Sequence, residues 1–266
     1  LKQSAPRTKV PVLERGGRKV TGAGIGEYRC MVQQDYGVPF TVLAGSAKRG
    51  LLVVAADGRG RRCAWAKHVA AAGTRFCRRV ILVDVFNTGE VRSRMRPPKG
   101  AFISKYWSIY GPHNQHAQHA FMAGRCSIGL AMEDVRTVLA ACGGRADEPV
   151  RFAGRGWPGL AFALLSAKMK NTDGCCMVRV PDCLATLADA TETFVDFNYI
   201  VPGLARLTDL PGIIRTTRSV RYALVAPLRL GETRVPYDDA KQFPNVRCFA
   251  SDTRKSAAAV GFACGR

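Results

Sequence analysis

Residues 150–165 constrain the fold of this chain more than any other stretch. A short apolar run, Val150–Ala153, leads into a corner that contains Gly154, Gly156 and Gly159, and an apolar helical segment, Leu160–Leu165, follows at once. A strand that turns sharply through glycines into a buried helix is half of a βα unit. The stretch therefore predicts a parallel sheet with at least one helix packed on it.

The remainder of the chain repeats this alternation. Gly50–Ala56 and Arg79–Phe86 are continuous apolar runs of strand length, which are typical of the buried centre of a parallel sheet. An alanine-rich helix is expected between them, and further elements are expected at Met122–Cys142 (helix), Cys175–Val180 (strand), Val220–Ala226 (strand) and Ser256–Ala263 (helix). We predict an α/β fold: a mostly parallel central sheet with helices on both faces.

Two parts of the chain depart from this pattern. Residues 1–22 are expected to form an extended basic arm, because Pro6, Pro11 and Gly16-Gly17 block regular structure. Residues 23–266 are expected to form a single domain, with an excursion at about 91–120 that is rich in arginine, aromatic residues and histidine. Near the start of the domain, the turn residues Asp35-Tyr36-Gly37 predict a β-hairpin.

Composition limits the partners that we expect. The 266 residues carry a formal net charge of +20, which favours a polyanion or an anionic surface as partner. No apolar run reaches the ~18 residues needed to span a bilayer, so no transmembrane segment is expected. RNA-recognition motifs are absent, so any RNA contact is expected to involve phosphate. The candidate contact residues are Lys2, Arg7, Lys9, Arg15, Arg18, Lys19, Arg59, Arg61, Arg62, Arg92, Arg94 and Arg96.

Cysteine and histidine give weaker signals. The ten cysteines show no Cys-x-x-Cys spacing and predict buried thiols in a reducing compartment. Cys126 or Ser127, with a base from His113, His116 and His119, is an alternative catalytic site, and the three histidines are an alternative metal site. The simpler interpretation, capping and a polar loop, predicts no metal and no cofactor.

The corner at 154–159 resembles the nucleophile elbow of the α/β-hydrolases, G-x-S-x-G between a strand and a helix. Its residues are Gly154, Arg155, Gly156, Trp157, Pro158 and Gly159. Further pieces, in the same order along the chain, resemble the acetyl xylan esterase-like and peptidase-like branch: Tyr36–Pro39, Leu82–Asp84 with Gly89-Glu90, Arg125 with Asp134, Tyr199–Leu204, Asp209–Pro211, Arg218–Val220 and Ala226-Pro227.

The resemblance implies a Ser–acid–His triad that this chain lacks. The nucleophile slot falls on Gly156, the acid slot falls near Arg229, and no histidine follows His119. We therefore expect no enzyme activity. The loop Asp57-Gly58-Arg59-Gly60 resembles the one that supplies oxyanion-hole amides, although a simple tight turn is the favoured interpretation. Tyr106, Trp107 and Tyr110, near Lys105, are expected either to stack on a base or to pack on their own domain.

These observations predict a non-catalytic structural subunit of a large mitochondrial assembly. The host would be either the mitochondrial ribosome or an inner-membrane respiratory complex, on the matrix side. The partners would be protein subunits and either rRNA phosphate or anionic lipid. Two alternatives stay open: an active serine or cysteine esterase or peptidase with an unrecognised nucleophile, and a pseudoenzyme that binds a small ligand.

Overall fold

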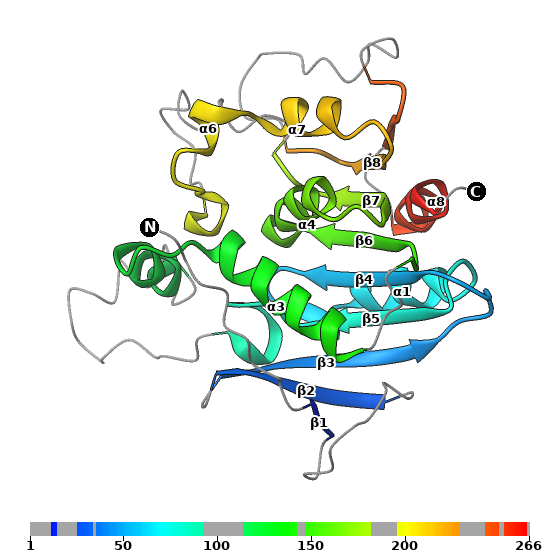
Figure 1. Ribbon diagram of the computed structural model, residues 1–266, viewed down its shortest axis with the longest axis horizontal. Coiled ribbons are helices and arrows are strands. Elements are labelled where there is room, and N and C mark those ends of the chain that lie inside the picture. Colours follow the sequence, from blue (N-terminus) through cyan, green and yellow to red (C-terminus); the bar gives the residue numbers. More distant parts are fainter. Residues whose placement is uncertain are drawn as a thin grey trace.

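One mixed sheet of nine strands organises the part of the chain that the computed structural model describes (Figure 1). The described residues are 12–14, 26–33, 36–92, 114–142, 147–181, 196–228, 243–249 and 253–264. The strands are β1 (Val12–Glu14), β2 (Gly26–Gln33), β3 (Tyr36–Ala44), β4 (Leu51–Ala56), β5 (Arg79–Val83), β6 (Val150–Arg155), β7 (Thr172–Val178), β8 (Arg221–Val225) and β9 (Val246–Phe249).

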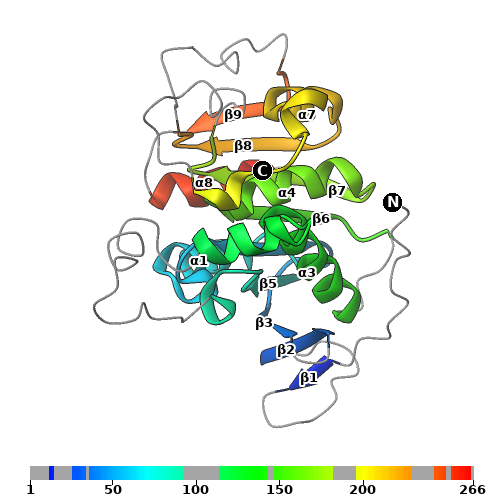
Figure 2. The same ribbon diagram turned by 90° about the vertical axis from the view of Figure 1, so that its left-hand side faces the viewer.

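The strand order is β1-β2-β3-β5-β4-β6-β7-β8-β9, and Figure 2 shows it from β1 at the bottom to β9 near the top. The six strands from β5 to β9 pair in parallel, while β1, β2 and β3 pair in antiparallel fashion. All six residues of β4 are buried, as expected for a strand covered on both faces. The antiparallel pairing of β2 with β3 confirms the predicted hairpin, although Tyr36 and Gly37, expected in the turn, belong to β3.

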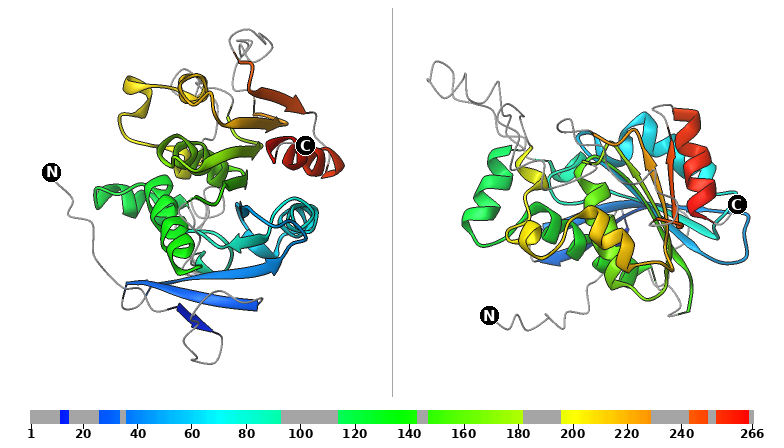
Figure 3. Two further views of the ribbon diagram at one scale, coloured as in Figure 1. Left: turned by 45° about the vertical axis from the view of Figure 1, so that its right-hand side comes forward. Right: turned by 90° about the horizontal axis from the view of Figure 1, so that it is seen from above.

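Helices cover both faces of the sheet, which confirms the predicted fold class (Figure 3, right). One face carries α1 (Ala64–Gly73) and α8 (Thr253–Ala263), which pack on each other and on one apolar core. The other face carries α3 (Ser127–Ala141), α4 (Trp157–Lys168) and α7 (Leu210–Thr216), over a second core. Short elements complete the order: η1 (Gly60–Arg62), η2 (Gly89–Val91), a helix at 114–122, η3 (Phe197–Tyr199) and α6 (Leu204–Leu207).

Some boundaries differ from the prediction. The helix expected from Met122 begins at Ser127, because Cys126 is extended and its sulfur accepts a hydrogen bond from the backbone N–H of Gly129. The sequence did not reveal β9, whose four residues are half-buried or exposed. Of the expected arm, the structure describes only β1, and residues 93–113 of the expected excursion lie outside the described part.

Candidate functional site

The candidate site lies where β4 and β6, two neighbouring parallel strands, end. The chain leaves β4 toward α1 on one face of the sheet and leaves β6 toward α4 on the other face. Such a reversal opens a crevice outside the carboxyl ends of the two strands, which is where ligands bind in open α/β sheets. Asp57 follows β4 directly, and Gly156 follows β6.

Gly156 has the backbone shape of a sharp strand-to-helix corner. Its φ of 67° and ψ of −150° lie in a region that residues with a Cβ rarely adopt. The backbone N–H of Gly156 donates to Val178 O (2.8 Å), and that of Asp57 donates to Arg155 O (3.1 Å). The corner is therefore held by hydrogen bonds to the strands on either side of β6.

The Asp57 side chain fills the space in front of this corner. A Cβ built on Gly156 would lie 2.2 Å from Asp57 Oδ2 and 2.6 Å from Asp57 Cγ. A side chain at position 156 would thus project into the volume that the Asp57 carboxyl group occupies. The neighbouring strand β4 therefore places a carboxyl group where a side chain at position 156 would lie.

Charged neighbours surround the Asp57 carboxyl group. Burial raises its pKa above the usual range, Arg155 and Arg179 act in the opposite direction, and Asp196 adds to the increase. Arg155 is half-buried and Arg179 is exposed. Among the described residues, neither guanidinium forms an ion pair with Asp57. Both therefore act on the carboxyl group through their charge rather than through a direct ion pair.

Backbone strain gathers at the same edge. Asn87, Arg179 and Ala226 have positive φ angles of 61°, 53° and 44°. They follow β5, β7 and β8 respectively, so all three lie beyond the carboxyl ends of parallel strands. Strained non-glycine residues cost of order 1–3 kcal/mol each and cluster at functional sites, which supports this edge as the site.

A polar layer connects the site to β5 and to the helix at 114–122. Asn198 in η3 hydrogen-bonds Asp196 (2.6 Å) and accepts from the Asn87 side chain (3.1 Å). Asn114 accepts from the backbone N–H of Phe197 (3.0 Å). His116 packs on Phe86 at 4.8 Å between ring centroids, and burial lowers the pKa of His116.

Among the residues that the structure describes, the alternative sites proposed from the sequence do not assemble. Cys126 caps α3, and the buried Ser127 hydroxyl has no hydrogen-bond partner among the described residues, so no histidine base is paired with either one there. The buried His116 Nδ1 has no hydrogen-bond partner among the described residues. In the same part of the chain, no three His, Cys, Asp or Glu side chains are placed to hold a metal ion. His113 lies outside the described residues.

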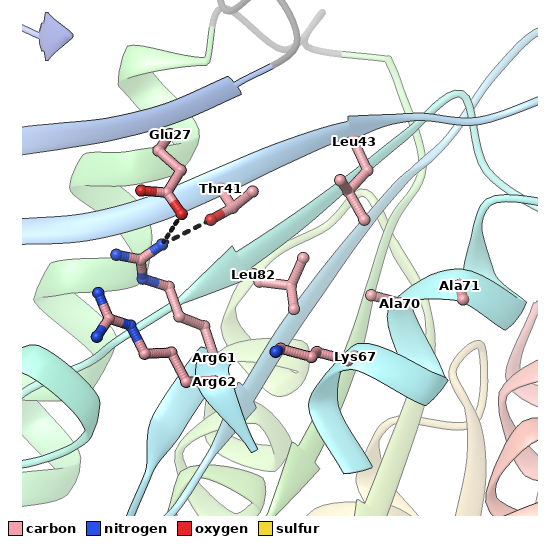
Figure 4. Close-up of a pocket in the computed structure, with 9 residues that line it drawn as sticks. All are labelled: Glu27, Thr41, Leu43, Arg61, Arg62, Lys67, Ala70, Ala71 and Leu82. Carbon is pink, nitrogen blue, oxygen red and sulfur yellow. Dashed lines mark hydrogen bonds and ion pairs between the residues drawn. The ribbon is translucent and has the colours of Figure 1, made fainter. Parts of the chain in front are cut away.

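Two of the arginines expected to meet a polyanion are engaged within the protein. Arg61 is 6% exposed and contacts Asp84 (3.2 Å), Glu90 (2.8 Å) and Glu27 (3.3 Å), and Arg62 also pairs with Glu90. Figure 4 shows Arg61 and Arg62 beside a cavity of about 480 Å³ between α1 and β3. The Gly156 corner does not line this cavity.

The other predicted site residues have different outcomes. Arg59 is exposed in the loop after Asp57, and Arg92 is half-buried. The acid slot near Arg229 lies outside the described residues. So do the remaining candidates for polyanion contact, which are Lys2, Arg7, Lys9, Arg15, Arg18, Lys19, Arg94 and Arg96. None of the described helices is long and apolar enough to cross a membrane.

Several solved structures share this architecture. The chain resembles a Bacteroides fragilis protein assigned as an acetyl xylan esterase, with a TM-score of 0.56 and 11% identity, over 85% of this chain and 66% of that one. It resembles proline iminopeptidase from Mycobacterium smegmatis (TM-score 0.50, 13% identity, 88% and 96% of the chains). It also resembles the thioesterase domain from the curacin biosynthetic pathway (TM-score 0.51, 11% identity, 91% and 98%). No protein-family model matches the sequence, and no curated protein matches it.

These findings correct the expected function. We expected a non-catalytic subunit of a mitochondrial ribosome or respiratory complex, and this expectation is wrong: the matched structures are an esterase, a peptidase and a thioesterase. In the structure, the Asp57 carboxyl group occupies the space in front of Gly156. The order of strands and helices, the corner at Gly156 and the three structural matches agree, and the chain has the α/β-hydrolase fold.

Proposed function

We propose that this protein is a hydrolase of ester bonds whose reactive group is the Asp57 carboxylate. The observation that carries the proposal is the 2.2 Å between Asp57 Oδ2 and a Cβ built at Gly156. This closeness means that the carboxylate lies where the side chain of a residue at the elbow tip would project. Asp57 is partly exposed, so a substrate can reach it.

In the proposed reaction, Asp57 acts as a general base toward water. The carboxylate takes a proton from a water molecule as the water oxygen attacks the ester carbonyl carbon. The tetrahedral intermediate then collapses, the bond from carbon to the alcohol oxygen breaks, and Asp57 returns the proton to the departing alcohol. The raised pKa of Asp57 favours this role, because a base works best when its pKa approaches the operating pH.

Positive charge at the same edge would stabilise the oxyanion of the intermediate. Arg155 and Arg179 carry guanidinium groups near Asp57. The backbone N–H of Trp157, the first residue of α4, has no acceptor within the helix and lies beside the corner, whereas Pro158 has no N–H and the Gly159 N–H donates to Gly156 O (2.9 Å). The two guanidinium groups also favour esters that carry a negative charge.

The test is hydrolysis of short-chain p-nitrophenyl esters by the full chain and by Asp57→Asn. We expect Asp57→Asn to lower kcat by about 100-fold or more, because general-base catalysis contributes roughly 10²–10⁴. Asp147→Asn is the matched control, since Asp147 is exposed and pairs with Arg49 before β6 begins. Circular dichroism and Tm would establish that both variants fold.

Equal activity in Asp57→Asn and in the unchanged protein would overturn the proposal. A fluorophosphonate probe identifies the competing mechanism. If the probe labels a serine and abolishes turnover, then a serine nucleophile from elsewhere in the chain does the chemistry.

A further inference from the structure

A pair of cysteines lies at the opposite end of the parallel strands from Asp57. Cys77 precedes β5, and Cys264 follows α8. Both belong to the same buried apolar cluster, and their neighbours meet, since a Cβ on Gly261 of α8 would lie 3.7 Å from the Phe76 ring, although 187 residues separate the two cysteines in sequence (264 − 77). Cys77 is fully buried and Cys264 is 8% exposed. Neither residue takes part in the proposed reaction.

A fixed positive charge lies against Cys77. The Arg151 guanidinium donates to Cys77 Sγ at 3.6 Å and to Phe76 O at 3.3 Å. Its other nitrogens bind both oxygens of Asp173 at 2.8 and 2.9 Å, a bidentate pair that fixes its position. Arg151 is the second residue of β6 and Asp173 is the second residue of β7. The two paired strands therefore hold the guanidinium group in place.

The two sulfurs have different chemical characters. Hydrogen bonds donated by the Cys264 thiol and by Arg151 lower the pKa of Cys77, despite its burial. The hydrogen bond to Cys77 and burial raise the pKa of Cys264. In reversible thiol oxidation, one sulfur attacks as a thiolate and a neighbouring thiol then attacks the oxidised sulfur, and the lowered pKa of Cys77 suits it to the first role.

The packing of the surrounding helices and strands also limits how far the two cysteines can move apart. The helices α1 and α8 pack on each other, and the end of α8 lies so close to β7 that a Cβ on Gly174 would be 1.9 Å from Ala263 O. This tight approach leaves little freedom for Cys264 to move away from Cys77. The buried Cys176, by comparison, has only burial acting on it, which raises its pKa to about 12.

We propose that Cys77 and Cys264 form a reversible disulfide when the protein meets a peroxide. The Cys77 thiolate attacks one peroxide oxygen, the O–O bond breaks, and hydroxide leaves, which gives a sulfenic acid on Cys77. The Cys264 sulfur then attacks the sulfenic sulfur, the S–O bond breaks, and water leaves with the Cys264 proton. Two thiols are oxidised, one peroxide is reduced to two molecules of water, and α8 becomes covalently bound to the segment before β5.

Mass spectrometry of the full-length protein tests the pairing. The protein is treated with hydrogen peroxide, free thiols are alkylated, and trypsin then releases Phe76–Arg78 and Ser256–Arg266 as separate peptides if no bond joins them. We expect these two peptides to be disulfide-linked after oxidation and to separate on reduction. Cys248→Ser, which changes an exposed cysteine, is the control and should leave the linkage intact.

Thermal unfolding gives a second readout. A disulfide that closes so long a loop should raise Tm by roughly 5–10 °C in the oxidised protein. Cys264→Ser should lose the linked peptide and the increase in Tm together. Failure to link these two peptides while Cys248 is oxidised, or linkage of Cys77 to a different cysteine, would overturn the proposal. The result is independent of ester hydrolysis, because Asp57 and the cysteine pair lie at opposite ends of the strands.

Discussion

At the scale of single residues, Gly156 and Asp57 depend on each other for space. Gly156→Ser places a Cβ 2.2 Å from Asp57 Oδ2 and in a strained backbone conformation, so we expect a loss of about 2 kcal/mol or more in the free energy of unfolding. Asp57→Gly removes the clash. The double variant should therefore be more stable than the sum of the two single changes predicts, by 1 kcal/mol or so. Urea unfolding of all four proteins measures this coupling, and additive effects would mean that the two side chains do not compete.

Asp134 on α3 should make stability depend on pH. Its Oδ2 accepts hydrogen bonds from the Phe86 N–H (2.6 Å) and the Tyr36 hydroxyl (2.9 Å), yet burial raises its pKa to about 7. The unfolded chain has an Asp pKa near 3.9, so the folded state holds the proton more tightly. Stability from this group is complete below about pH 4 and is lost as pH rises toward about 7, at up to about 1.4 kcal/mol per unit.

Asp134→Asn isolates this contribution, since the amide oxygen can still accept both hydrogen bonds but cannot ionise. We expect urea unfolding to show a smaller loss of stability between pH 4.5 and 7.5 in the variant than in the unchanged protein. Identical pH dependence in the two proteins would assign the loss to other groups.

At the scale of elements, β6 and α4 meet at van der Waals distance without intervening side chains. A Cβ on Gly154 would lie 2.4 Å from Gly159 Cα and 2.9 Å from Phe162. Gly154→Ala should therefore lower the free energy of unfolding by about 1–3 kcal/mol. Gly129→Ala is the matched control, because its Cβ meets only Cys126 Sγ at 3.3 Å and alanine favours the helix. Equal losses in the two variants would show that the close approach is not what limits position 154.

The elements that the sequence could predict are those with strong local patterns. The buried strand β4, the corner at Gly156 and α4 all follow from apolar runs and glycine spacing. β9 could not be predicted in this way, because an exposed edge strand has no apolar periodicity. The sequence shows Asp57 only as a turn residue. Its closeness to Gly156 results from the pairing of β4 with β6, which the local sequence does not reveal.

At the scale of the whole molecule, the net charge of +20 acts against compactness. Like charges repel more strongly in the folded state, and salt screens this repulsion. We expect Tm to rise by a few degrees between roughly 10 and 300 mM NaCl. Differential scanning fluorimetry across this range measures the effect. A fall in Tm would instead mean that internal ion pairs, such as Arg78 with Glu148, dominate the electrostatics.

The hydrogen bonds that hold the corner have one more consequence. The Gly156 N–H reaches Val178 O on one side, and Arg155 O receives the Asp57 N–H on the other, so the corner is fastened through main-chain atoms alone. Its main-chain hydrogen bonds involve no side-chain atom, while its φ angle and the nearby Asp57 restrict position 156 to glycine. Because Asp57 and Gly156 follow adjoining strands, a side chain at one position takes space from the other, while the main-chain bonds beneath are the same in either case.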